Sequence, residues 1–143
     1  MQNKNSIGME KIKQTFLSLV RGNVPVNKMI PLLVGQNAGG TSAESSDKKE
    51  ILAYQAYCCA LMARDAKSRL QQIQYVKEYN TLIQHSLYLD SQGISARLVR
   101  FLIEKNLKNV IFVSHADEDR QFLTEHAAED KDMEELIEKI LAA

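Results

Sequence analysis

The sequence contains few of the residues that end regular secondary structure, with two prolines and six glycines in 143 residues. Folds built from many short strands need frequent turn residues, so this scarcity favours long helices. The chain also lacks an excess of either charge, because 18 Lys and Arg residues are matched by 18 Asp and Glu residues. Domains that bind nucleic acid or anionic membranes usually carry a basic excess, so neither is predicted as the partner.

Cysteine is scarce as well, and the two cysteines present, Cys58 and Cys59, are neighbours in the sequence. Adjacent residues of a helix point about 100° apart, which argues against a disulfide between them. We therefore expect no disulfide framework and no zinc motif, but two small apolar side chains on one helix.

Long apolar runs are also absent. No stretch approaches the ~18 apolar residues that a membrane span needs. The polar residues 1–8 do not resemble a signal peptide, and we expect them to form a disordered tail. As printed, the chain is expected to be soluble and cytoplasmic; if a leader was removed, the alternative is a periplasmic or exported protein. Its length and 45% hydrophobic content are typical of one globular domain, residues 1–143.

The first part of the chain predicts an N-terminal helical segment over residues 9–34. Apolar residues at helical spacing follow Met9, and Gly22 is placed to end that helix. Pro25 lies near the start of a second apolar run. We expect only one or two short helical turns there, because Pro31 would kink or interrupt a longer helix. Residues 35–46 are rich in Gly, Ser and Asn and predict a flexible loop without the P-loop pattern of a nucleotide site.

Residues 47–143 are expected to form a helical core. A strong helix is predicted over residues 47–66, capped by Ser46 or Asp47, with small side chains that let a partner helix come close. A second helix follows and ends at the turn signal of residues 90–93. The short join between the two predicts antiparallel neighbours.

Three further helices complete the predicted core. The segment 94–106 is apolar nearly all round and should be buried, with Arg100 and Glu104 spaced to form an ion pair. Ser114 is expected to cap an acidic first turn, and the last helix shows a clear apolar stripe. The apolar run 110–113 has no strand to pair with, so a packed loop or short helix is favoured there. The fold class is therefore all-α, with antiparallel helical hairpins.

The sequence Leu-Asp-Ser-Gln-Gly over residues 89–93 precedes a new helix at Ser95. This pattern resembles the tetratricopeptide repeat, in which the second helix commonly ends with Leu-Asp-Pro. Ser91 stands where proline is usual, and the hairpins would begin near residues 47 and 94, a longer period than the standard ~34 residues. The resemblance implies a tetratricopeptide-like bundle.

A second likeness is carried by residues 53–56, by residues 97–106 and by the acidic stretch 117–123. These segments resemble a group of small uncharacterised bacterial proteins that are typically exported. A glycine-tyrosine turn expected after Asn106 is replaced by residues 112–115, and the export leader is missing. The resemblance implies a fold and a bacterial origin, but no activity.

The best candidate for chemistry is a group of histidines and carboxylates, the ligand types that zinc and iron prefer: His115, Asp117, Asp119 and His126. Helical geometry separates them, because His115 and Asp117 fall on different faces and Asp119 and His126 lie two turns apart. We therefore expect no metal, no cofactor and no catalytic residue. A metal-binding protein or enzyme that uses His115 and Asp119 is kept as an alternative hypothesis.

Tyrosines on the two central helices are the best candidates for partner binding. Tyr75 and Tyr79 share a face and, with Tyr54, could line a groove for a protein or peptide, since tyrosine is enriched at interfaces. Arg64 and Arg69, near the helix junction, are candidates to select acidic segments. The first hypothesis is a non-catalytic helical-hairpin module that binds a protein or peptide. A further alternative is a small helical immunity or antitoxin protein, and nothing in the sequence points to an oligomeric state.

Overall fold

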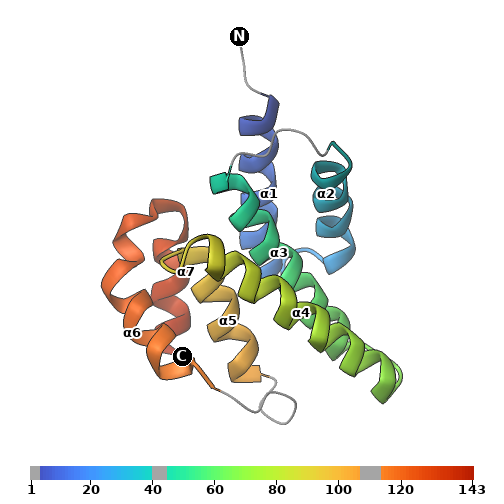
Figure 1. Cartoon of the computed structure of the whole chain (residues 1–143). Helices are drawn as coiled ribbons and strands as arrows, with labels where there is room; N and C mark the ends of the chain where they lie inside the picture. Colours follow the sequence, from blue (N-terminus) through green and yellow to red (C-terminus); the bar gives the residue numbers. More distant parts are fainter. Residues whose placement is uncertain (1–3, 40–44, 107–113) are drawn as a thin grey trace.

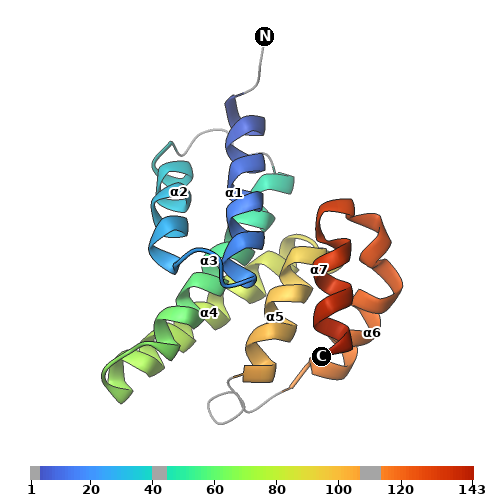
Figure 2. The ribbon, with the colours of Figure 1, turned by 180° about the vertical axis from the view of Figure 1, so that it is seen from behind.

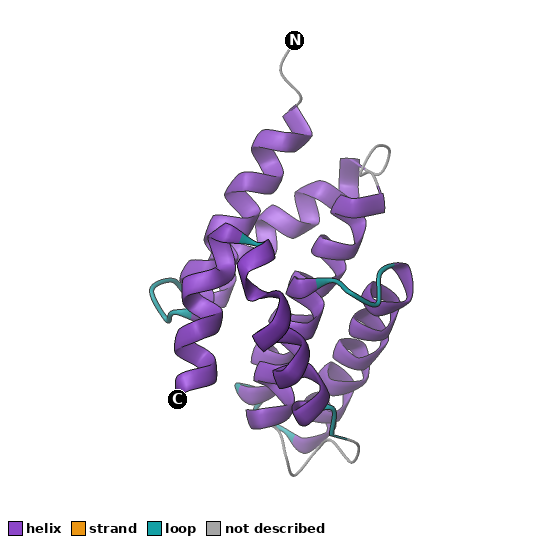
Figure 3. Cartoon of the chain, turned by 90° about the vertical axis from the view of Figure 1, so that its left-hand side faces the viewer, coloured by secondary structure: helices purple, strands orange, loops and turns teal. Residues whose placement is uncertain are grey.

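The computed structural model describes residues 4–39, 45–106 and 114–143. Over these ranges the regular elements are all helices and no strand forms, which confirms the all-α part of the prediction (Figures 1 and 3). The elements are α1 (Lys4–Val20), α2 (Val26–Gly39), α3 (Ser45–Arg64), α4 (Arg69–Leu89), α5 (Ile94–Asn106), α6 (Ala116–His126), the short 3₁₀ turn η1 (Ala127–Glu129) and α7 (Lys131–Ala142).

Helix α1 starts earlier than the sequence predicts. Residues 4–8 of the expected tail are helical, whereas residues 1–3 lie outside the described part of the chain. Gly22 ends this helix as predicted, with a φ of 80° that glycine adopts without strain. The N–H groups of Gly22 and Asn23 donate to the carbonyls of Leu19 and Ser18, the Schellman arrangement of a helix end.

Helix α2 is longer than predicted, and the prediction that Pro31 interrupts it is wrong. One helix runs from Val26 through Pro31 to Gly39. Pro31 removes only the bond to the carbonyl of Asn27, and both residues are exposed, so water can satisfy that carbonyl. The predicted loop 35–46 is therefore wrong at both ends: residues 35–39 belong to α2 and residues 45–46 to α3. Residues 40–44 lie outside the described ranges.

Helix α3 lies at the centre of the fold (Figure 1). No side chain between residues 51 and 63 is exposed, and the small residues Ala53, Ala56 and Ala60 are buried, which allows neighbouring helices to come close. Helices α2, α4 and α5 pack against α3. Its expected cap is wrong by one or two residues, because α3 begins at Ser45 and so places Ser46 and Asp47 in its first turn.

Helices α4 and α5 follow the predicted boundaries closely. Ser68 caps α4 by accepting a hydrogen bond from the N–H of Gln71. Helix α4 lies beside α3, to which a short turn over residues 65–68 joins it (Figures 1 and 2). Helix α5 is buried as predicted, with Leu98 and Val99 fully shielded from solvent.

The C-terminal helices form a layer against α5 (Figure 2). Helix α6 has the predicted acidic first turn, but His115 precedes it and Ser114 is not its cap. The Ser114 hydroxyl instead accepts from the N–H of Ala116, within the turn. Asp130 caps α7, whose apolar stripe is buried as predicted. The segment 110–113 lies outside the described residues.

Helix α1 is held to α3 by aromatic stacking. The ring of Phe16 lies 4.4 Å from the ring of Tyr54, measured between centroids, and meets Tyr57 edge to face at 5.4 Å. Phe16 is fully buried. Because such offset and edge contacts add to the hydrophobic gain of burial, Phe16 fixes the position of α1.

We predict that Phe16→Ala lowers the free energy of unfolding by about 3–5 kcal/mol, since it empties a buried aromatic site. Leu70→Ala is the control, because Leu70 is 67% exposed on α4 and its loss should change stability by no more than about 0.5 kcal/mol. Urea unfolding followed by circular dichroism measures both. Equal small effects would contradict this role of Phe16.

Candidate functional site

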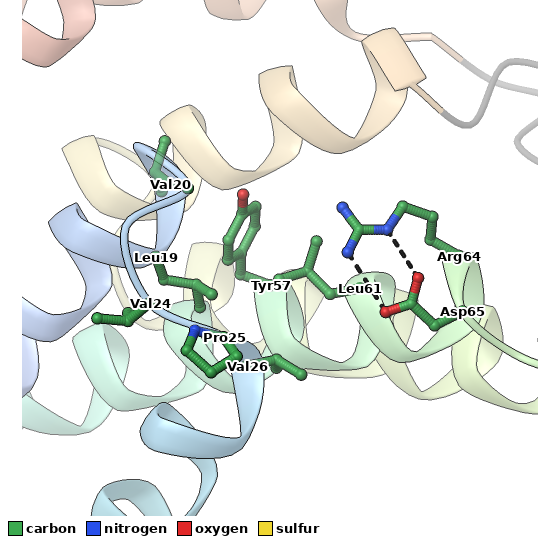
Figure 4. A pocket seen from close by; sticks show the side chains of 10 residues that line it. Leu19, Val20, Val24, Pro25, Val26, Tyr57, Leu61, Arg64 and Asp65 are labelled. Carbon is green, nitrogen blue, oxygen red and sulfur yellow. Dashed lines mark hydrogen bonds and ion pairs between the residues drawn. The ribbon is translucent and has the colours of Figure 1, made fainter.

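A pocket of about 370 Å³ opens between the α1–α2 turn and α3 (Figure 4). We call it the α1–α3 pocket. Three segments supply its walls, namely the end of α1, the turn leading into α2, and the last turns of α3. The lining residues are Leu19, Val20, Gly22, Val24, Pro25, Val26, Tyr57, Leu61, Arg64 and Asp65.

Local sequence places these side chains together. Tyr57, Leu61 and Arg64 are spaced by four and three residues, which puts them on one face of α3, and Figure 4 shows them on the same side of that helix. Gly22 turns the chain out of α1, and Pro25 leads it into α2. The apolar turn thus lies opposite an apolar stripe that ends in a charged residue.

The pocket has an apolar floor and a charged rim. Leu19, Tyr57 and Leu61 are buried, whereas the side chains of Arg64 and Asp65 are 63% and 58% exposed. Arg64 Nε donates to Asp65 Oδ1 at 3.0 Å, and Arg64 Nη2 donates to Oδ2 at 3.3 Å. This pairing lowers the pKa of Asp65 and raises that of Arg64, so the rim carries one full charge of each sign at neutral pH.

The Tyr57 hydroxyl adds a neutral polar group to the pocket. Burial raises the pKa of Tyr57, and the nearby Arg64 guanidinium partly opposes that rise. The phenol therefore stays protonated at neutral pH and can donate a hydrogen bond. Because the lining residues include no histidine, cysteine, serine or threonine, the pocket has the chemistry of a binding site for an aliphatic side chain with a polar flank.

Of the predicted partner-binding residues, only Arg64 lines this pocket. Arg69 is exposed and Tyr75 half-buried, and both lie on α4 outside the lining. Tyr54 and Tyr79 are 0% and 2% exposed, and neither is among the lining residues of the α1–α3 pocket. The predicted tyrosine groove therefore stays a prediction.

The candidate metal ligands each bind a different partner. His115 Nδ1 is 2.7 Å from Glu104 Oε2, and the His115 backbone N–H donates to the same carboxylate. His126 pairs with Glu129 at 2.6 Å and stacks on Phe122. Over the described ranges, no three His, Cys, Asp or Glu residues are grouped so that they could hold a metal ion.

Asp119 instead takes part in an ion-pair cluster between α5 and α6. Its carboxylate is fully buried and accepts hydrogen bonds from Arg100 Nε and Nη2, both at 2.7 Å, and from Arg97 Nη1 at 3.1 Å. Glu118 adds a bond to Arg97 at 2.7 Å. The predicted pair of Arg100 with Glu104 is therefore wrong, because each binds a residue at the start of α6.

A second pocket, of about 360 Å³, lies between α1, α3 and the start of α7, and Tyr54 contributes to its lining. Several of its polar groups take part in hydrogen bonds. Glu50 Oε2 accepts from the hydroxyls of Tyr54 and Ser95, each at 2.6 Å, and Lys13 donates to Asp130 at 2.9 Å. Burial, with the Glu50 charge, raises the pKa of Tyr54 well above its usual value. The Ser95 bond joins α5 to α3 and the Lys13 bond joins α1 to the cap of α7, so we assign this region a structural role.

Comparison of the chain with protein-family models, with curated proteins and with solved structures found no match. No helix of the described ranges is both long and apolar enough to cross a membrane. The α1–α3 pocket is therefore judged as a site on its own geometry.

We predict that Asp119→Ala lowers the free energy of unfolding by about 3 kcal/mol, because it leaves two largely buried guanidinium groups without their shared carboxylate. The control is Asp117→Ala in the same first turn, where an exposed carboxylate interacts only with the helix dipole and contributes about 0.5 kcal/mol. Thermal and urea unfolding measure both. A loss for Asp119→Ala no larger than that of the control would contradict the cluster's structural role.

Proposed function

We propose that this chain is a non-catalytic helical module that binds a segment of a partner protein in the α1–α3 pocket. The observation that supports this most is the pocket itself, in which the charged side chain of Arg64 follows the aliphatic floor along α3. Specific sites of this kind pair an apolar cavity with a few polar groups that orient the ligand. Its volume suits one or two aliphatic side chains of a peptide.

We also propose that the helices are organised as antiparallel hairpins in a tetratricopeptide-like bundle. The side-by-side packing of α3 and α4 across a short turn supports the first hairpin, and the contacts of α5 with α6 support the second. Modules of this kind bind peptides on surfaces between helix pairs. In this chain the binding surface lies between the first hairpin and the N-terminal helices.

A binding role, rather than catalysis, is also supported by the lining residues. Activated nucleophiles need a neighbouring base within hydrogen-bond reach. Tyr57, Arg64 and Asp65 supply the polar groups of this pocket, and Asp65 is exposed and paired with Arg64. The two cysteines are poor nucleophiles, because burial raises the pKa of Cys58 to about 12 and that of Cys59 to about 11.

The proposal is tested by selecting a displayed library of random linear peptides against the full chain. We predict that enriched peptides bind wild type and lose at least about tenfold in affinity, or about 1.4 kcal/mol, on Val24→Phe. The added ring enlarges a side chain that lines the pocket. Fluorescence anisotropy with labelled peptides measures the affinities.

Val34→Phe is the matched control, since Val34 is an exposed valine of α2 that does not line the pocket. It makes the same chemical change ten residues farther along the chain, in α2 rather than in the α1–α2 turn. Circular dichroism establishes that both variants fold. Failure to enrich any peptide, or equal binding of enriched peptides to both variants, would refute the proposed function.

A further inference from the structure

We infer that the segment bound by the α1–α3 pocket is acidic and inserts an aliphatic side chain, an inference that rests on the proposed function. The partner chemistry follows from the charge around the pocket, from the groups at its mouth and from the charge at the opposite end of the molecule.

The chain segments that line the pocket are rich in basic residues. Within residues 19–28 and 57–70, which include its whole lining, five basic residues stand against one acidic residue, Asp65. All five basic side chains are exposed: Arg21, Lys28, Arg64, Lys67 and Arg69. A surface of this charge attracts an acidic segment and repels a basic one.

The net charge of zero hides a separation of charge along the chain. Residues 114–143 contain ten acidic and three basic residues, so the excess of basic residues lies before them. Helices α6 and α7, which those residues form, lie on the far side of the molecule from the α3–α4 turn (Figures 1 and 2). The resulting field orients an acidic partner toward the pocket end and away from the C-terminal layer.

At the mouth, Arg64 is the group that can bind a partner carboxylate. Its bonds to Asp65 use Nε and Nη2, and Nη1 takes part in neither. An exposed pair of this kind contributes little to stability, so Arg64 can turn toward a carboxylate that is partly shielded from water. The protonated Tyr57 hydroxyl, on the same face of α3, offers a second donor.

Asp65 opposes this interaction, because its carboxylate competes for Arg64 and repels an acidic ligand. Neutralising it should therefore strengthen binding of an acidic segment. A second copy of the chain is a poorer occupant, although its C-terminal layer is acidic. The apolar residues of α7, Met133, Leu136 and Ile137, are buried in their own fold and cannot serve as an anchor.

The test uses two synthetic peptides with the same central leucine pair, flanked by glutamates in one and by lysines in the other. Fluorescence anisotropy with the full chain should show at least about tenfold tighter binding of the glutamate peptide, or about 1.4 kcal/mol. Raising the salt concentration should weaken that binding, because the attraction is screened. Val24→Phe should weaken it as well, since the leucine pair would lose its pocket.

Matched variants locate the interaction. Arg64→Gln should weaken binding of the glutamate peptide several-fold, whereas Lys77→Gln, which removes the same charge from an exposed site on α4 outside the lining, should not. Asp65→Asn should tighten it. Arg64 and Asp65 are exposed, so these variants should fold, and circular dichroism verifies this.

Three outcomes would overturn the inference: tight binding of the lysine peptide, equal effects of Arg64→Gln and Lys77→Gln, or no binding of the glutamate peptide. A fourth such outcome would come from sedimentation. If the chain self-associates and Arg64→Gln abolishes that association, a second copy of the chain is the occupant of the pocket. Equal binding of both peptides, if blocked by Val24→Phe, would overturn the acidic preference while leaving the proposed function in place. The library selection decides that function separately.

Discussion

The structure depends on one constraint, the covering of helix α3 by other helices for more than three turns. Between residues 51 and 63 no side chain is exposed and only Gln55, Cys59 and Met62 are half-buried, so α3 needs neighbours around most of its circumference. Alanines let those neighbours approach closely, and Phe16 fills the space that the two tyrosines Tyr54 and Tyr57 leave. The other helices are arranged by this requirement: α1 and α2 cover one part of α3, and α4 and α5 cover the rest.

The candidate site lies at the end of α3 that the surrounding helices do not fully cover. The last turns of α3 pass the α1–α2 turn, which approaches Tyr57 and Leu61 without closing over them, and Arg64 follows at the rim. Farther along the chain, buried charge has a different use. The ion pair between Asp119 and Arg100 joins α5 to α6, so these charges stabilise the fold. The exposed basic residues near the pocket are not used in this way and are available to a partner. The packing of the helices thus buries the charges between α5 and α6 and leaves those near the pocket exposed.

Local rules predicted much of the fold but little of the site. The helix Ile94–Asn106, the glycine end of α1 and the stripe of α7 follow from periodicity and capping alone. Pro31 was misjudged because a proline removes only one bond when the freed carbonyl faces water. The rule that residues i and i+4 of a helix pair could not predict the partner of Arg100, because that partner, Asp119, is 19 residues away. The sequence shows that Tyr57, Leu61 and Arg64 share one face of a helix. Only the fold shows that an apolar turn lies opposite that face.

Native-state hydrogen exchange tests the central role of α3 most directly. If this helix needs neighbours around most of its circumference, its amides should exchange only through global unfolding, with protection equal to the full free energy of unfolding. The amides of α2, which packs against α3, and of α7, which packs against α6, should exchange faster through local opening. Amides of residues 51–63 that exchange faster than those of α2 would contradict the account.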